Sequence, residues 1–92
     1  MIYNVYCIRD LKVGFLSPVL ELSDDIARRN FEHSFGISGT LYDTHPEDFD
    51  LCRVATFDSE RGVFKSLSSP VVVDTGLQCS LRRSSHVSDS VH

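Results

Sequence analysis

The chain has 92 residues, nine Lys plus Arg against thirteen Asp plus Glu, a formal charge of −4 and no Trp. A domain of this size buries about 60–65% of the surface that its unfolded chain exposes, so a large enzyme scaffold is excluded. Apolar runs such as Val71–Val73 are far shorter than the roughly 20 residues that a membrane helix needs. The N-terminal residues lack the basic segment of a signal peptide. We therefore expect a soluble protein that contacts no membrane.

Charge and cysteine content narrow the class of partner. Residues 1–74 sum to −5 and residues 75–92 to +1. Because binding to bare phosphate depends on Lys and Arg, an acidic body argues against a strong nonspecific DNA coat. The three cysteines, Cys7, Cys52 and Cys79, form no C-x-x-C pair. An odd number without such a pair suits a reducing compartment, so free thiols are expected.

The first half of the chain predicts strands followed by a helix. Residues 2–9 are rich in β-branched and aromatic side chains and predict a strand. Residues 15–21 look extended, but Pro18 lacks an N–H, so we expect a short or irregular strand at a sheet edge. Ser23 is a favourable N-cap, and apolar residues at helical spacing predict a helix over 24–35, the only long one.

The second half predicts mainly strands. Residues 36–44 have the composition of a loop. The capping pattern from Thr44 to Glu47, with Pro46 in its first turn, predicts one helical turn at 46–49. Alternation and turn residues predict the remaining elements: a strand over 51–57, a hairpin loop at 58–62, a return strand over 63–67 and, after Pro70, a short edge strand at 71–73.

This β-β-α-β-β order predicts an α+β fold, with a small, mostly antiparallel sheet of four to five strands and one main helix packed on it. We expect a single domain over residues 1–74. Residues 75–92 carry five serines and few apolar side chains. Such a segment cannot bury enough surface to offset the entropy of ordering, so a flexible C-terminal tail is expected.

One acidic cluster invites a metal-site interpretation. Its spacing matches neither an EF-hand nor a zinc pattern, and helix capping already accounts for part of it, so we predict no metal and no cofactor. Cys7 and Cys52 fall in predicted strands, apart from any histidine or nucleophile elbow, so we predict no enzyme. The residues of the acidic cluster are Asp43, His45, Glu47, Asp48 and Asp50.

Aromatic and basic side chains each admit two interpretations. Rings on predicted strands form a hydrophobic core or a platform on which bases stack, and large rings dominate small cores. Exposed cations are solvated surface groups or phosphate contacts, and isolated exposed arginines are ordinary. The rings concerned are Tyr3, Tyr6, Phe57 and Phe64, and the cations are Lys12, Arg28, Arg29 and Arg53.

The chain also contains several short sequence motifs in a characteristic order and spacing. The strings are Pro18, then Asp25-x-Ala27-x-Arg29-x-Phe31, then His45-Pro46-Glu47-Asp48-Phe49-x-Leu51, then Asp58 with Gly62. Together with the opening residues, they resemble the small nonstructural protein of gokushoviruses, single-stranded DNA phages of the microvirus family. The resemblance covers about residues 1–73, and the string at 45–49 is its specific part.

This resemblance implies an early protein of the host cytoplasm, absent from the virion. It also implies a role in DNA binding and in turning genome synthesis from duplex to single-stranded product. Arg29 and residues 45–49 are matching positions, and no role is carried over for any of them. The Ser-rich segment after Asp74 extends beyond the family's usual ending.

Two hypotheses of different classes result. In the first, a nonenzymatic regulator binds single-stranded DNA. In the second, an acidic adaptor binds viral or host replication proteins without touching DNA. In either case, exposed strand edges at Pro18 and 71–73 predict a homodimer or higher oligomer. For the first, the phosphate contacts would be Lys12, Arg28, Arg29 and Arg53, and the stacking residue Tyr3 or Tyr6.

Overall fold

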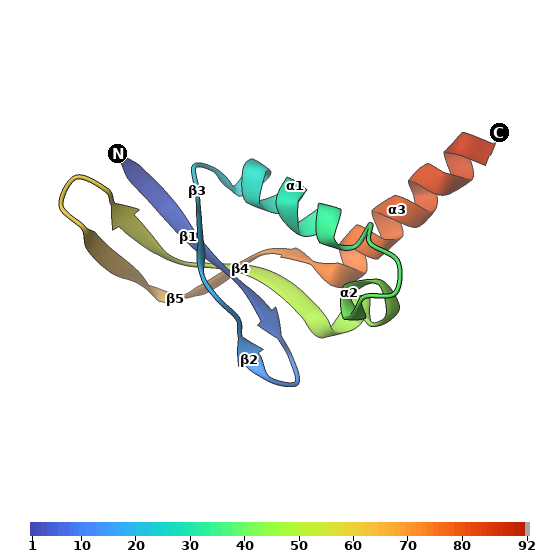
Figure 1. Cartoon of the computed structure of the whole chain (residues 1–92), viewed down its shortest axis with the longest axis horizontal. Helices are drawn as coiled ribbons and strands as arrows, with labels where there is room; N and C mark the ends of the chain where they lie inside the picture. Colours follow the sequence, from blue (N-terminus) through green and yellow to red (C-terminus); the bar gives the residue numbers. More distant parts are fainter. Residues whose placement is uncertain (92) are drawn as a thin grey trace.

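The structure is a computed structural model that describes the backbone of residues 1–91 and the side chains of residues 1–83. Figure 1 shows a curved sheet with helices gathered toward one end. Within the described residues, no helix is both long and apolar enough to cross a membrane. The elements in chain order are β1 (Ile2–Asp10), β2 (Gly14–Phe15), β3 (Val19–Glu21), α1 (Asp24–Ser34), α2 (Leu41–Thr44), the 3-10 turn η1 (Pro46–Asp48), β4 (Phe49–Asp58), β5 (Val63–Thr75) and α3 (Gly76–Val91).

The sheet is antiparallel with the order β2-β1-β4-β5, and β3 also pairs with β1. This arrangement confirms the predicted α+β class. The pairing of β1 with β4 shifts in the middle: Tyr6 lies opposite Arg53, whereas Val5 lies opposite Ala55. Val54 is thus an extra residue, a β-bulge, and paired side chains stay on the same face on both sides of it.

The core lies between one face of the sheet and the helices. Tyr6 and Leu51 on the sheet pack with Phe31 of α1, with its C-cap Phe35 and with Cys79 of α3. The rings of Phe31 and Phe35 meet edge to face, with centroids 4.9 Å apart. Burial of these large apolar side chains stabilises the domain.

The predicted helix and strands are present with small differences in extent. The Ser23 hydroxyl accepts a hydrogen bond from the amide of Ile26 at 3.3 Å, which confirms it as the N-cap of α1. Pro18 falls between β2 and β3, where the irregular segment was expected. The strands predicted on either side of Pro70 are one element, β5, which accommodates Pro70 where its pairing with β4 is interrupted.

Two helical segments were not predicted. The loop expected at 36–44 contains α2, whose N-cap Thr40 accepts from the amide of Asp43. Where the flexible tail was expected, the structure has α3, a helix of 16 residues against 11 in α1, so the prediction of a single long helix is wrong. In Figure 1, α3 leads away from the sheet to the C-terminus. Its first turns are tied to the body by Cys79, which is fully buried.

Candidate interaction surface

The two faces of the sheet differ in what covers them. Along β1, Tyr6 and Ile8 belong to the face that packs against α1. Side chains alternate along a strand, so Val5 and Cys7 lie on the opposite face, which contributes nothing to the helix-covered core. We call this opposite face the open face. From the alternation and the pairing of the strands, it consists of Tyr3, Val5, Cys7, Phe15, Leu20, Cys52, Ala55, Phe57, Phe64 and Val72.

The open face is apolar, with small residues at its centre and larger ones around them. Its central residues are buried, with Cys52 fully so, whereas Phe64 on β5 is 62% exposed. The rings of Phe57 and Phe64 lie with centroids 4.5 Å apart. Several large apolar side chains exposed on one face of a sheet are a feature that interaction surfaces share. Its exposed members are Phe15, Leu20, Phe64 and Val72.

One ion pair lies at the border of this face. Arg9 donates to Asp50, with Nη2 2.6 Å from Oδ2, and the two residues are opposite each other on β1 and β4. The guanidinium also lies 5.9 Å from the centre of the Phe15 ring. The hydrogen bond to Asp50 raises the pKa of Arg9, so the guanidinium stays charged, and its charge is balanced by the carboxylate that it contacts. The open face therefore presents apolar surface without net charge.

The structure does not gather the predicted phosphate contacts. Arg53 lies on the helix-covered face, with its Nε 3.9 Å from Asp24 Oδ1. Arg28 pairs with Asp25 at 2.8 Å within α1. Arg29 is exposed on the same helix, and Lys12 is exposed in the turn between β1 and β2. Two of these four cations pair with carboxylates, and the four lie on three separate parts of the fold, so together they form no continuous basic surface.

The two candidate stacking residues differ in accessibility. Tyr6 is fully buried and donates to Asp24 Oδ1 at 2.5 Å, while its oxygen accepts from Asn4 at 3.0 Å. Burial, followed by the hydrogen bond to Asp24, raises the pKa of Tyr6 to about 12. No ring face is free for a base, so the structure contradicts Tyr6 as a stacking residue. Tyr3 is half-buried beside Phe57 on the open face.

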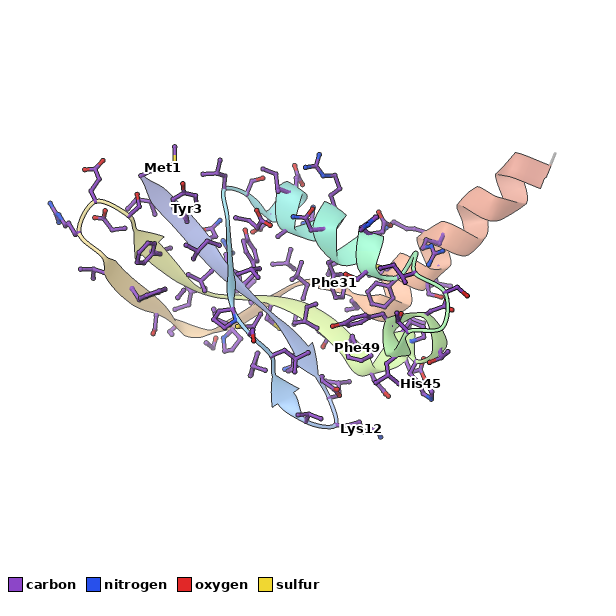
Figure 2. All side chains as sticks on the ribbon, in the orientation of Figure 1. Met1, Tyr3, Lys12, Phe31, His45 and Phe49 are labelled. Atoms are coloured by element: carbon purple, nitrogen blue, oxygen red, sulfur yellow. The ribbon has the colours of Figure 1, made fainter. Side chains whose placement is uncertain are left out.

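Tyr3 and Lys12 are also far apart. Figure 2 shows Tyr3 near the N-terminal end of β1 and Lys12 at the projecting turn beyond its other end.

The sequence did not predict three exposed residues of the open face, Phe15, Leu20 and Val72. The sequence of β1 could have indicated a second contact face. Its odd-numbered and its even-numbered residues are both mainly apolar, a pattern typical of strands whose two faces both make contacts.

Polar side chains in the acidic segment around residues 43–50 make local hydrogen bonds. Asp43 Oδ2 accepts from the amide of Gly39 at 3.2 Å, and the Thr44 hydroxyl lies 2.8 Å from His45 Nδ1. Across the part of the chain with described side chains, no three His, Cys, Asp or Glu groups are arranged to hold a metal ion.

Burial raises the pKa of each of the three thiols, to about 12 for Cys79. A raised pKa lowers the thiolate fraction and makes these thiols weak nucleophiles.

The chain is similar to a family of phage proteins. Residues 3–79 match the family model described as Phage ORF5 protein. This range includes the open face, α1 and the buried Cys79 at the start of α3. No curated protein and no solved structure matches the chain.

Proposed function

We propose that this chain, which belongs to the Phage ORF5 protein family and is a phage protein, is a nonenzymatic adaptor in viral DNA replication. In this proposal it binds viral or host replication proteins through the open face, in the host cytoplasm and outside the virion. The replication role follows from the resemblance to gokushovirus nonstructural proteins. The mode of action rests on one observation, namely an apolar sheet face without net charge on a protein whose predicted phosphate-contacting cations are not gathered on one surface.

The physical argument compares two kinds of partner. A nucleic acid needs several cations on one surface, because neutralising phosphates supplies most of its affinity. A protein partner needs apolar side chains, with aromatic rings favoured at the centre of the contact. The open face offers the exposed ring of Phe64 beside Phe57, and its only ion pair is internally neutralised. This combination favours a protein partner.

Two neighbouring residues of β5 provide a matched test. Phe64 is 62% exposed on the open face, and Val63 is 53% exposed on the other face. Phe64→Asp places a charge in the proposed contact, whereas Val63→Asp places the same charge one residue away and outside it. Tagged protein is used to capture partners from infected cells after nuclease treatment, and the captured proteins are identified by mass spectrometry.

We expect the unmodified chain and Val63→Asp to retain a viral or host replication protein, and Phe64→Asp to lose it. Retention of every replication protein by Phe64→Asp would contradict docking at the open face. Loss of all replication proteins from the unmodified chain after nuclease treatment would contradict the adaptor function itself.

Direct binding of single-stranded DNA is a second candidate, favoured by the rings on the open face. Tyr3, Phe57 and Phe64 share this face, and a base stacked on an aromatic ring contributes about 1–3 kcal/mol. Fluorescence anisotropy of a labelled single strand at two salt concentrations tests it. Stacking predicts weaker binding for Phe64→Ala and unchanged binding for Val63→Ala. Absence of binding at low salt would exclude this candidate.

A further inference from the structure

An apolar groove runs along α1 on the helix-covered side of the sheet. Its volume is about 470 Å³, within the range of pockets that hold ligands or side chains. Apolar side chains from β1, α1 and the segment around β3 line it, including Ile8, Leu16, Val19 and Phe31. The groove therefore has the size and chemistry to receive apolar side chains.

A carboxylate lies at the rim of this groove. Glu21, the last residue of β3, accepts from Asn30 Nδ2 at 2.6 Å. Among the described side chains, Glu21 forms no ion pair with a cation. An apolar groove bordered by a carboxylate that lacks a counter-charge is complementary to an apolar side chain next to a cation.

The chain itself presents such a group in the turn between β1 and β2. Leu11 is 54% exposed and Val13 is 77% exposed, and Lys12 lies between them. Lys12 forms no ion pair within the described part of the chain. The side chain of Val13 is too exposed to occupy the groove of its own molecule.

Hydrogen bonds fix the shape of this turn. The amides of Lys12 and Val13 donate to the side chain and the carbonyl of Asp10, at 2.9 and 3.1 Å. The amide of Leu11 donates to the carbonyl of Asp48 at 2.8 Å, which anchors the turn to the end of η1. Because the turn is already ordered, docking it would cost little conformational entropy.

We propose that two copies of the chain form a symmetric dimer in which the turn at residues 11–13 of each copy docks in the α1 groove of the other. Lys12 then pairs with the other copy's Glu21, and Val13 enters the apolar part of the groove. The contact is reciprocal, so a single two-fold axis satisfies both turns and both grooves and closes the assembly at two copies. The groove and the open face lie on opposite sides of the sheet, so this dimer does not depend on the proposed function.

Charge reversal provides the test. Sedimentation equilibrium over a range of concentrations measures the dissociation constant of the full chain. Lys12→Glu and Glu21→Lys each place like charges together at both contacts, and we expect each variant alone to dimerise at least about tenfold more weakly than the unmodified chain. An equimolar mixture of the two variants restores opposite charges at both contacts, so we expect dimerisation to return.

Matched controls reverse charges away from the groove. Lys65→Glu and Glu60→Lys make the same changes on the β4–β5 hairpin, and we expect them to leave the dissociation constant unchanged. Phe64→Asp is also expected to leave it unchanged, so failure of the dimer and failure of the adaptor function are distinguishable. A monomer at every concentration, unweakened dimerisation of Lys12→Glu, or no recovery in the mixture would overturn the proposal.

Discussion

The carboxylate of Asp74 and the guanidinium of Arg82 form an ion pair, with Oδ2 2.7 Å from Nη2. The Asp74 side chain is 2% exposed, and it also accepts from the thiol of Cys79 at 3.4 Å. Arg82 additionally pairs with Glu32 of α1 at 3.0 Å. One guanidinium thus connects α3 to the end of β5 and to α1.

Replacing Arg82 tests how strongly this pair holds α3. Arg82→Met leaves the buried carboxylate of Asp74 without a cation, and we expect the free energy of unfolding to fall by about 3 kcal/mol, the lower end for a buried pair because the Arg82 side chain is 44% exposed. Arg28→Met is the control, because Asp25 is 90% exposed, and we expect a change below about 0.5 kcal/mol. Urea denaturation measures both values. A loss for Arg82→Met no larger than that of the control would contradict the argument.

The same contacts explain which elements the sequence could predict. Helix α1 was predictable because its N-cap Ser23 and its apolar spacing are local features. The start of α3 was not, because its order depends on residues distant in sequence, with Arg82 meeting Glu32 of α1. Composition shows a Ser-rich segment after Asp74, and nothing in it reveals that Cys79 will be buried.

A substitution at Gly76 tests how closely the start of α3 approaches η1. A Cβ at this position would overlap the carbonyl oxygen of Pro46, so Gly76→Ala requires a shift of the backbone. We expect a loss of about 1–3 kcal/mol in the free energy of unfolding, the usual cost of overpacking. The control Gly36→Ala brings a Cβ only to 3.2 Å from the carbonyl oxygen of His33. Chemical denaturation showing equal losses would contradict the close approach.

The candidate surface was predictable only in part. Alternation placed Phe57 and Phe64 on strands, but the faces depend on the bulge at Val54, which sequence does not reveal. Alternation along β1 places Tyr3 and Tyr6 on opposite faces of that strand, but it does not tell which face the helices cover. The structure separates them, because Tyr6 turns toward Asp24 on α1 and Tyr3 lies on the open face.

The buried Tyr6 predicts a specific loss of stability at high pH. Its pKa is raised to about 12 in the folded chain, against about 10 for an ordinary tyrosine. Between these values, the unfolded chain releases the Tyr6 proton first. The stability that Tyr6 contributes is therefore complete below about pH 10 and declines as the pH approaches about 12.

Tyr6→Phe removes this titration. We expect the decline in the free energy of unfolding from about pH 10 to about pH 12 to be smaller in the variant by about 2 kcal/mol. At neutral pH the variant should be less stable by about 1 kcal/mol, because it loses the hydrogen bond to Asp24. Urea titrations at several pH values measure both effects, and parallel pH profiles for the two proteins would contradict the prediction.

The three buried thiols give a test of the whole packing arrangement. Burial raises the pKa of Cys7 and Cys52, and burial together with Asp74 raises that of Cys79 to about 12. Low accessibility and a low thiolate fraction both slow reaction with a disulfide reagent such as dithionitrobenzoate. We expect all three to react rapidly in denaturant and none at a comparable rate in the folded chain near neutral pH.

Single Cys→Ser variants identify any thiol that departs from this expectation. Rapid reaction at Cys79 would contradict the docking of α3 onto the core. Rapid reaction at Cys7 or Cys52 would instead show that the rings around the centre of the open face leave it accessible. Because the two outcomes concern opposite faces of the sheet, the measurement distinguishes a loosely held helix from an open surface.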